Sequence, residues 1–139
     1  MQVKVLLVSL VLAACATTPP QSNWALVEGC WIDASDAIPP ASMVWRADPD
    51  HPGVLLGAWS VAYPGEDADV VTFTLAPAAD GMRLCEHAPA AAEHCTRAIL
   101  APATLRDGDA LFEVNAESLT FGNSDRPAPF FMGRRGGCS

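Results

Sequence analysis

The sequence predicts a small all-β domain in which short strands follow one another as an antiparallel meander. Over most of the chain, apolar and polar side chains alternate with a period of two, the period of a strand that buries one face. Turn-forming residues separate these stretches at short intervals. The chain has 139 residues, which is enough for one hydrophobic core. Such a meander either closes into a barrel or packs as a sandwich.

The first 14 residues are predicted to be an export signal. Lys4 precedes an apolar stretch at 5–11, which is shorter than the roughly 20 residues of a membrane-spanning helix. The stretch ends with Leu-Ala-Ala before Cys15, which resembles the lipobox of bacterial lipoproteins. The resemblance implies cleavage before Cys15 and acylation of its sulfur and amino group. Ala16, where an inner-membrane retention signal has aspartate, implies the outer membrane. The alternative is a secreted protein with a chance cysteine near its cleavage site.

Cleavage would leave a mature chain with two parts. Residues 15–22 are small, polar and proline-containing, so we expect a lipidated tether that lifts the domain off the lipid surface. Residues 23–139 are expected to form a single β domain. The mature chain loses Lys4 and keeps 7 arginines against 16 acidic residues, a net charge of −9. This balance, without clusters of basic residues, argues against a nucleic-acid partner.

The predicted strands occur in order along this domain. The first opens at Gly29-Cys30-Trp31, and the other alternating stretches lie at 42–45, 54–63, 71–75, 82–84, 97–99, 111–114, 119–121 and 130–132. Segments with turn composition lie between them, at 48–53, 64–67, 79–81, 106–109 and 122–125. Only 23–28 and 89–94 could form a helical turn, and both are short.

Four cysteines remain once Cys15 is lipidated, and an exported protein normally pairs an even set. Three pairings are possible. We favour Cys85 with Cys95, because this link closes a local loop. The second link is then Cys30 with Cys138, which joins the two ends of the domain and restricts the unfolded chain more strongly.

Two resemblances bear on the fold. Gly29-Cys30-Trp31, after a short apolar segment with Trp24 and Leu26, resembles the Gly-x-Trp start of lipocalin-like (calycin) barrels. This resemblance implies a closed barrel of about eight strands, in which Trp31 packs on an arginine of the last strand. Further positions resemble an uncharacterised family of small exported bacterial proteins: Trp24, Gly29-Cys30-Trp31, Trp45, Leu56-Gly57, Phe121-x-Asn123, Pro129 and Arg134-Arg135. The His-Asp-Phe-Pro stretch of that family is Arg-Pro-Ala-Pro at 126–129 here, so no site is carried over from it.

Strand alternation tests the two expected contacts between the ends of the domain. Cys30 and Trp31 point to opposite faces, so their partners near the last strand must also differ by an odd number of residues. Arg135 and Cys138 meet this condition, whereas Arg134 and Cys138 do not. We therefore expect Trp31 to form a cation–π pair with Arg135. The Cys30–Cys138 disulfide then lies on the other face.

One sequence cluster has the composition of a metal site. Cys85-Glu86-His87 and Glu93-His94-Cys95 mirror each other, and two thiolates with two imidazoles could hold zinc. In an oxidising compartment we favour a disulfide, because zinc would require both thiols to stay reduced. A weaker option is a surface metal site made by the histidines and glutamates around an intact disulfide. We therefore expect no resident metal and no cofactor.

No arrangement typical of an enzyme occurs in the sequence. There is no Gly-x-Ser-x-Gly elbow, and none of the three histidines has an evident catalytic partner. His51, the acidic tip at 66–69 and Asp107-Gly108-Asp109 have the composition of turns. Glu113 is expected to face solvent on an amphipathic strand. We therefore do not expect catalysis.

The resulting hypothesis is an outer-membrane lipoprotein that faces the periplasm. Its barrel would bind a small apolar ligand, with Trp45, Trp59 and Phe73 as candidate contacts. The alternative is a structural or interaction protein of the cell envelope, in which the same side chains fill a solid core. Whether the interior is hollow or packed separates the two hypotheses.

Overall fold

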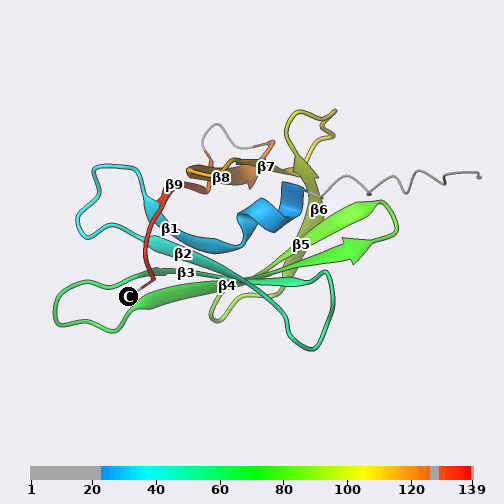
Figure 1. The fold of residues 1–139 in the computed structure, drawn as a ribbon. Helices are drawn as coiled ribbons and strands as arrows, with labels where there is room; N and C mark the ends of the chain where they lie inside the picture. Colours follow the sequence, from blue (N-terminus) through cyan, green and yellow to red (C-terminus); the bar gives the residue numbers. More distant parts are fainter. Residues whose placement is uncertain (1–22, 126–128, 139) are drawn as a thin grey trace, which may run out of the picture.

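A computed structural model describes residues 23–125 and 129–138, so the predicted signal (1–14), the tether (15–22) and Cys15 lie outside the described residues. The described chain forms one short 3-10 helix, η1, and a closed barrel of nine strands joined in chain order (Figure 1). The bounds are η1 Asn23–Val27, β1 Gly29–Asp33, β2 Ser42–Ala47, β3 Leu55–Val61, β4 Asp69–Ala78, β5 Gly81–His87, β6 His94–Leu100, β7 Ala110–Val114, β8 Ser118–Asn123 and β9 Phe131–Arg135. The predicted all-β barrel is confirmed, with nine strands.

The odd number of strands explains one departure from the predicted antiparallel order. In a closed ring of consecutive strands, the directions can alternate all the way round only if the number of strands is even. Here β6 and β7 run parallel, with Ala98 paired to Ala110. The crossover at 101–109 returns the chain from one end of the barrel to the other between these strands. A simple meander, as expected from the alternation alone, has no such segment.

Helical structure in the described residues is confined to η1. Of the two predicted helical turns, 23–28 is therefore confirmed, whereas 89–94 contains turns and no helix. Val27 at the end of η1 is buried, and its carbonyl accepts a hydrogen bond of 2.9 Å from the indole N–H of Trp31. Within the described part of the chain, no helix has the length and apolar character needed to cross a membrane.

Side chains from all nine strands fill the barrel. Phe112 and Phe121 stack with ring centroids 4.9 Å apart, and the Trp45 ring lies 6.2 Å from each of them. On β3, Gly57 is paired directly with Trp45, and a Cβ at Gly57 would come within 2.7 Å of the indole ring. The core strand residues are Trp31, Met43, Trp45, Leu55, Phe73, Leu75, Leu84, Ala98, Ala110, Phe112, Leu119, Phe121 and Phe131. The interior is thus packed with aromatic and aliphatic side chains.

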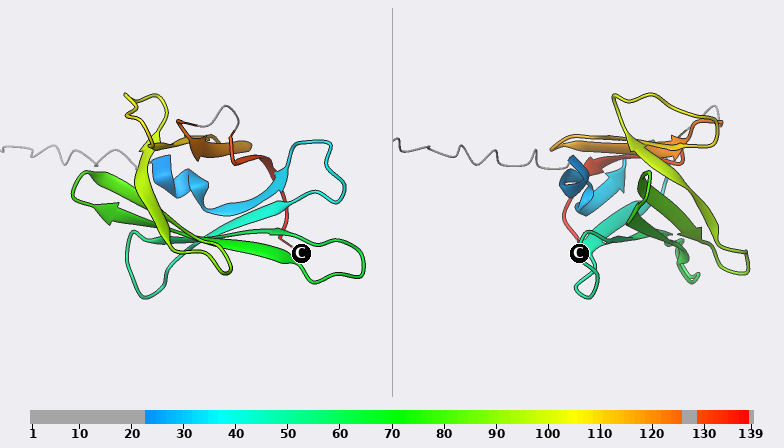
Figure 2. Two further views of the ribbon diagram at one scale, coloured as in Figure 1. Left: turned by 180° about the vertical axis from the view of Figure 1, so that it is seen from behind. Right: turned by 90° about the vertical axis from the view of Figure 1, so that its right-hand side faces the viewer.

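The two ends of the barrel carry different segments. The first, called the η1 end, carries η1, the loop at 48–54 and the tight turn at 79–80. The second, called the loop end, carries the loops at 34–41 and 62–68, which project on the same side in two opposite views (Figures 1 and 2).

Candidate functional site

The first and last strands close the barrel through the two contacts expected from strand parity. Trp31 is paired with Arg135 across β1 and β9, and the guanidinium carbon lies 4.2 Å from the Trp31 ring centroid. The Cys30–Cys138 disulfide is also present, with Cα atoms 5.6 Å apart. Both predicted contacts therefore occur together.

Arg135 also fastens the neighbouring segments to this closure. Its Nε donates to the carbonyl of Ala116 at 2.7 Å, and its two terminal nitrogens donate to the carbonyls of Glu28 and Leu26 at 3.2 and 3.0 Å. Gly29 leaves room for the guanidinium, because a Cβ there would collide with it. Since the guanidinium is committed to backbone carbonyls and to the Trp31 ring, its role is structural.

The three residues predicted to contact a ligand inside the barrel are part of its packing. Trp45 and Phe73 are buried in the core, and the half-buried Trp59 packs on Phe130 with ring centroids 6.2 Å apart. A cavity beside Phe73 and Phe121 has a volume of about 20 Å³, which is room for about one water molecule. In the described structure, Trp45 and Phe73 therefore pack in the interior of the barrel, and Trp59 packs against that core.

A larger apolar groove runs over the outside of the barrel, across β2, β3, β4 and β5. Its volume is about 610 Å³. Because alternate residues of a strand face outward, each of these strands contributes side chains that the core does not use. Leu56 is the largest aliphatic residue of the groove and is 43% exposed. The lining residues are Val44, Arg46, Ala47, Pro49, Leu56, Gly57, Ala58, Thr72, Phe73, Thr74 and His87. Of the three predicted ligand contacts, only Phe73 also borders this groove.

Arg46 gives the groove its charge. It is exposed on β2 and forms no ion pair with any described residue. None of the described residues that line the groove is acidic, although the whole sequence has 16 acidic residues against 8 basic ones. An apolar channel with one unpaired cation is complementary to a molecule that has an apolar body and an anionic group.

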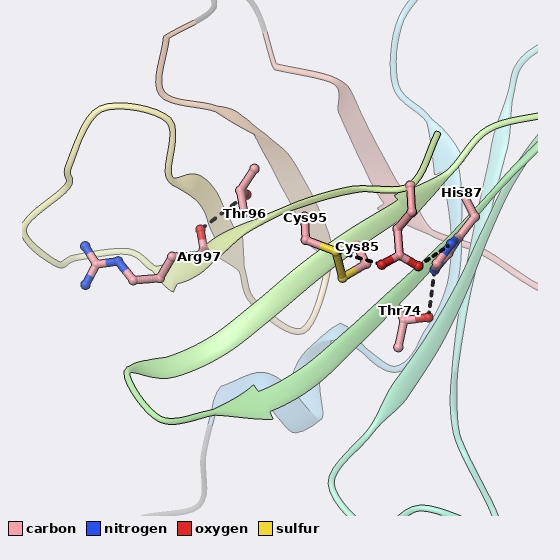
Figure 3. Close-up of a disulfide and its surroundings, with 7 residues drawn as sticks. Thr74, Cys85, His87, Cys95, Thr96 and Arg97 are labelled. Carbon is pink, nitrogen blue, oxygen red and sulfur yellow. Dashed lines mark hydrogen bonds and ion pairs between the residues drawn. A yellow bond between two sulfur atoms is a disulfide. The ribbon is translucent and has the colours of Figure 1, made fainter. Parts of the chain in front are cut away.

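The second predicted disulfide lies beside the His87 side of the groove (Figure 3). Cys85 and Cys95 are paired directly across β5 and β6, and their Cα atoms are 4.1 Å apart. Glu93 Oε1 lies 3.2 Å from Cys95 Sγ, and Glu93 Oε2 lies 3.2 Å from His87 Nδ1. The Nε2 atom of His87 lies 3.2 Å from Thr74 Oγ1. His87 is therefore oriented from both sides, by the carboxylate and by the hydroxyl.

The mirrored cysteine cluster does not come together as one ligand set. Glu86 is paired with His94, and strand alternation places this pair on the face opposite to the cysteines. Among the described residues, Cys85, Glu93 and Cys95 are the one group of three or more with potential ligand atoms within 4.8 Å of one another. Because the two sulfurs are joined, as the disulfide prediction required, neither is a thiolate ligand.

An ion pair that no sequence pattern indicated, between the half-buried Arg97 and the buried Asp109, holds the crossover at 101–109. Arg97 donates from Nε and Nη2 to the two carboxylate oxygens of Asp109, at 3.1 and 2.6 Å, and the backbone N–H of Arg106 donates to Asp109 at 2.8 Å. The Arg97 hydrogen bonds keep the pKa of Asp109 below its usual 3.8, and the Arg106 N–H adds to this effect. The pair borders a polar cleft of about 590 Å³ that also contains Glu86 and Asp125. It fixes β7 beside β6.

Asp109→Asn is expected to lower the thermal stability of the protein at neutral pH. Since the pKa of Asp109 is lower in the folded protein than its ordinary 3.8, its stabilising effect is complete above that pH and is lost as the pH falls through the folded pKa. The difference in Tm between wild type and variant, measured by circular dichroism, should therefore shrink below pH 3.8. Asp107→Asn is the control, because its side chain makes no hydrogen bond to the described residues. A difference that persists undiminished in strong acid would contradict this assignment.

The other groups assigned to turns lie where they were expected. His51 Nδ1 is 2.8 Å from Asp48 Oδ2, and both belong to the loop at 48–54. The backbone N–H of Asp50 and the His51 side chain lower the pKa of Asp48. Glu113 is exposed on β7. The contacts of His51 and Asp48 shape the loop at 48–54.

Comparisons of this sequence and fold with protein-family models, curated proteins and solved structures give no match. The groove and its single cation are therefore the features from which a function is inferred.

Proposed function

We propose that this protein is a lipid-anchored protein of the bacterial outer membrane that binds an anionic amphiphile in the outer groove of β2–β5. The observation that carries the proposal is the unpaired Arg46 in a groove whose other described lining residues are apolar or neutral. The ligand would be a single-chain molecule with a carboxylate or phosphate head. The expected apolar contacts thereby move from the interior to the outer face of the barrel.

The dimensions of the groove suit such a ligand. Its volume of about 610 Å³ lies within the roughly 300–1,000 Å³ of small-molecule sites. Val44, Leu56 and Ala58 offer apolar contact, and covering such surface contributes about 25 cal/mol per Å². Arg46 would donate hydrogen bonds to the anionic head, which distinguishes this ligand from a neutral or cationic amphiphile.

The packed interior also favours a second candidate, an interaction protein of the envelope with a solid core. In both cases Cys15 would carry the acyl chains that keep the domain at the membrane. Mass spectrometry of the amino-terminal peptide from bacterial membranes tests the anchor. Acyl groups on Cys15 are expected, and an unmodified or uncleaved amino terminus would contradict the lipoprotein assignment.

Binding of dodecanoate to the full-length Cys15→Ser chain, measured by calorimetry, tests the groove. We expect Arg46→Gln to weaken dodecanoate binding by about tenfold, since it removes a charge-assisted hydrogen bond. Leu56→Asn is expected to weaken it by a similar factor, because it removes apolar contact. Dodecyltrimethylammonium should bind the wild type more weakly than dodecanoate does, and Arg46→Gln should not weaken its binding further.

Two control variants distinguish binding in the groove from binding elsewhere on the protein. Arg83→Gln removes the same charge from β5 outside the groove and should leave dodecanoate binding unchanged. Trp45→Phe alters the interior and should also leave it unchanged. Equal binding by wild type and Arg46→Gln would overturn the proposal, whereas loss of binding in Trp45→Phe alone would place the ligand inside the barrel.

A further inference from the structure

Exposed apolar residues gather at the loop end of the barrel, at positions that do not line the groove. Ile38, in the loop at 34–41, is 94% exposed. Tyr63, in the loop at 62–68, and Val70, just after it on β4, are 45% and 39% exposed. A single exposed apolar side chain is ordinary, but several on neighbouring segments mark an interaction surface.

These segments are neighbours in the fold as well as in the views of Figures 1 and 2. Ser42, directly after the first loop, is paired with Ser60, and their hydroxyl oxygens are 3.2 Å apart. Ser60 in turn is paired with Val70 across β3 and β4. The two loops therefore connect four adjacent strands, β1 to β2 and β3 to β4, and project on the same side of the molecule.

The same surface has a single sign of charge. Residues 33–42 and 60–70 contain five acidic residues and no lysine, arginine or histidine; the acids are Asp33, Asp36, Glu66, Asp67 and Asp69. None of the five forms an ion pair with another described residue. Unpaired like charges around an apolar patch repel one another in the isolated protein, and a basic partner would relieve that repulsion.

We propose that the two loops form a docking surface for a basic protein partner, whose apolar side chains cover Ile38 and Tyr63 while its lysines or arginines face the five carboxylates. Charge excludes the other occupants. An anionic lipid surface would be repelled by these carboxylates. A second copy of the chain would bring together two molecules that are each strongly acidic.

The geometry suits a protein held by its amino terminus. Asn23, the first described residue, begins η1 at the opposite end of the barrel from the two loops (Figure 1). The docking surface thus points away from the point where the preceding chain enters the domain. This surface shares no lining residue with the groove, so the inference goes beyond the proposed ligand binding.

Fluorescence anisotropy with a labelled peptide of alternating lysine and leucine tests the surface, again with the full-length Cys15→Ser chain. The test variant combines Asp36→Asn, Glu66→Gln, Asp67→Asn and Asp69→Asn. The matched control combines Asp50→Asn, Asp80→Asn, Glu113→Gln and Glu117→Gln, which removes the same charge from exposed positions outside the two loops. We expect the loop variant to lose about tenfold in affinity at physiological salt and the control to change by less than about twofold.

The apolar part of the surface is tested separately. Ile38→Ser should lower the affinity for the lysine–leucine peptide about fivefold without changing the salt dependence of binding. A lysine–serine peptide should bind Ile38→Ser and the wild type with the same affinity. Equal weakening by both charge variants would overturn the proposal, because the peptide would then respond to net charge alone. A concentration-dependent dimer that Ile38→Ser abolishes would also overturn it, because the surface would then bind a second copy of this chain. Dodecanoate binding should be the same in all these variants, so failure here is distinguishable from failure of the groove.

Discussion

Removal of the Cys30–Cys138 disulfide is expected to lower the free energy of unfolding by about 4 to 5 kcal/mol, the loop-closure entropy of a link across 108 residues. The link restricts the unfolded chain more than the folded one, because β1 and β9 are already paired in the barrel. Urea unfolding of the Cys30→Ser/Cys138→Ser double variant, against the oxidised wild type, measures the effect.

The second disulfide supplies a matched comparison for this prediction. Cys85 and Cys95 have a sequence separation of 10. The Cys85→Ser/Cys95→Ser variant should therefore lose less free energy of unfolding, about 3 kcal/mol. The prediction would be contradicted if the local pair proved the more stabilising of the two. That result would mean that the ends of the barrel stay together in the unfolded chain.

Trp45→Ala is expected to lower the free energy of unfolding by about 3 to 5 kcal/mol. Trp45 is fully buried and lies against the rings of Phe73, Phe112 and Phe121, 6.0 to 6.2 Å away between centroids. Its removal would leave a cavity beside Gly57, which has no side chain to move into the space. Urea unfolding followed by far-UV circular dichroism measures the loss.

Trp45→Phe separates packing from hydrogen bonding at the same site. The buried indole N–H of Trp45 has no hydrogen-bond acceptor among the described residues. Its removal therefore breaks no hydrogen bond, and the variant should lose less than about 2 kcal/mol, chiefly through reduced volume. A loss as large as that of the alanine variant would show that the N–H contributes to the stability of the core.

Strand alternation predicted the parts of the fold that depend on which side chains are apolar. It identified the inward residues Trp45, Phe73 and Phe121, and parity selected Arg135 over Arg134 as the partner of Trp31. The parallel pairing of β6 and β7 was not predicted, because alternation within a strand does not show the direction in which the neighbouring strand runs. Asp109 lies in a segment with the composition of a turn. No residue near it in the sequence indicates that Arg97 is its partner.

The candidate site was harder to predict for a related reason. Alternation shows that Leu56 on β3 and Phe73 on β4 point to opposite faces of the sheet. It does not show which face of the sheet carries a groove large enough for a ligand. Aromatic residues suggested a ligand chamber, whereas in the barrel they occupy its interior. The groove is lined by residues of four strands and by Pro49 of the loop at 48–54, and no short sequence pattern shows that these residues come together.

The pairing of β1 with β9 has a consequence for the biogenesis of the protein. Trp31 cannot meet Arg135 until β9 has been synthesised, because about 100 residues lie between these strands. Until then, β1 has a free edge that can pair with other extended chains. The ring is therefore completed only once β9 is available to pair with β1, so the barrel cannot close strand by strand while the chain is being made.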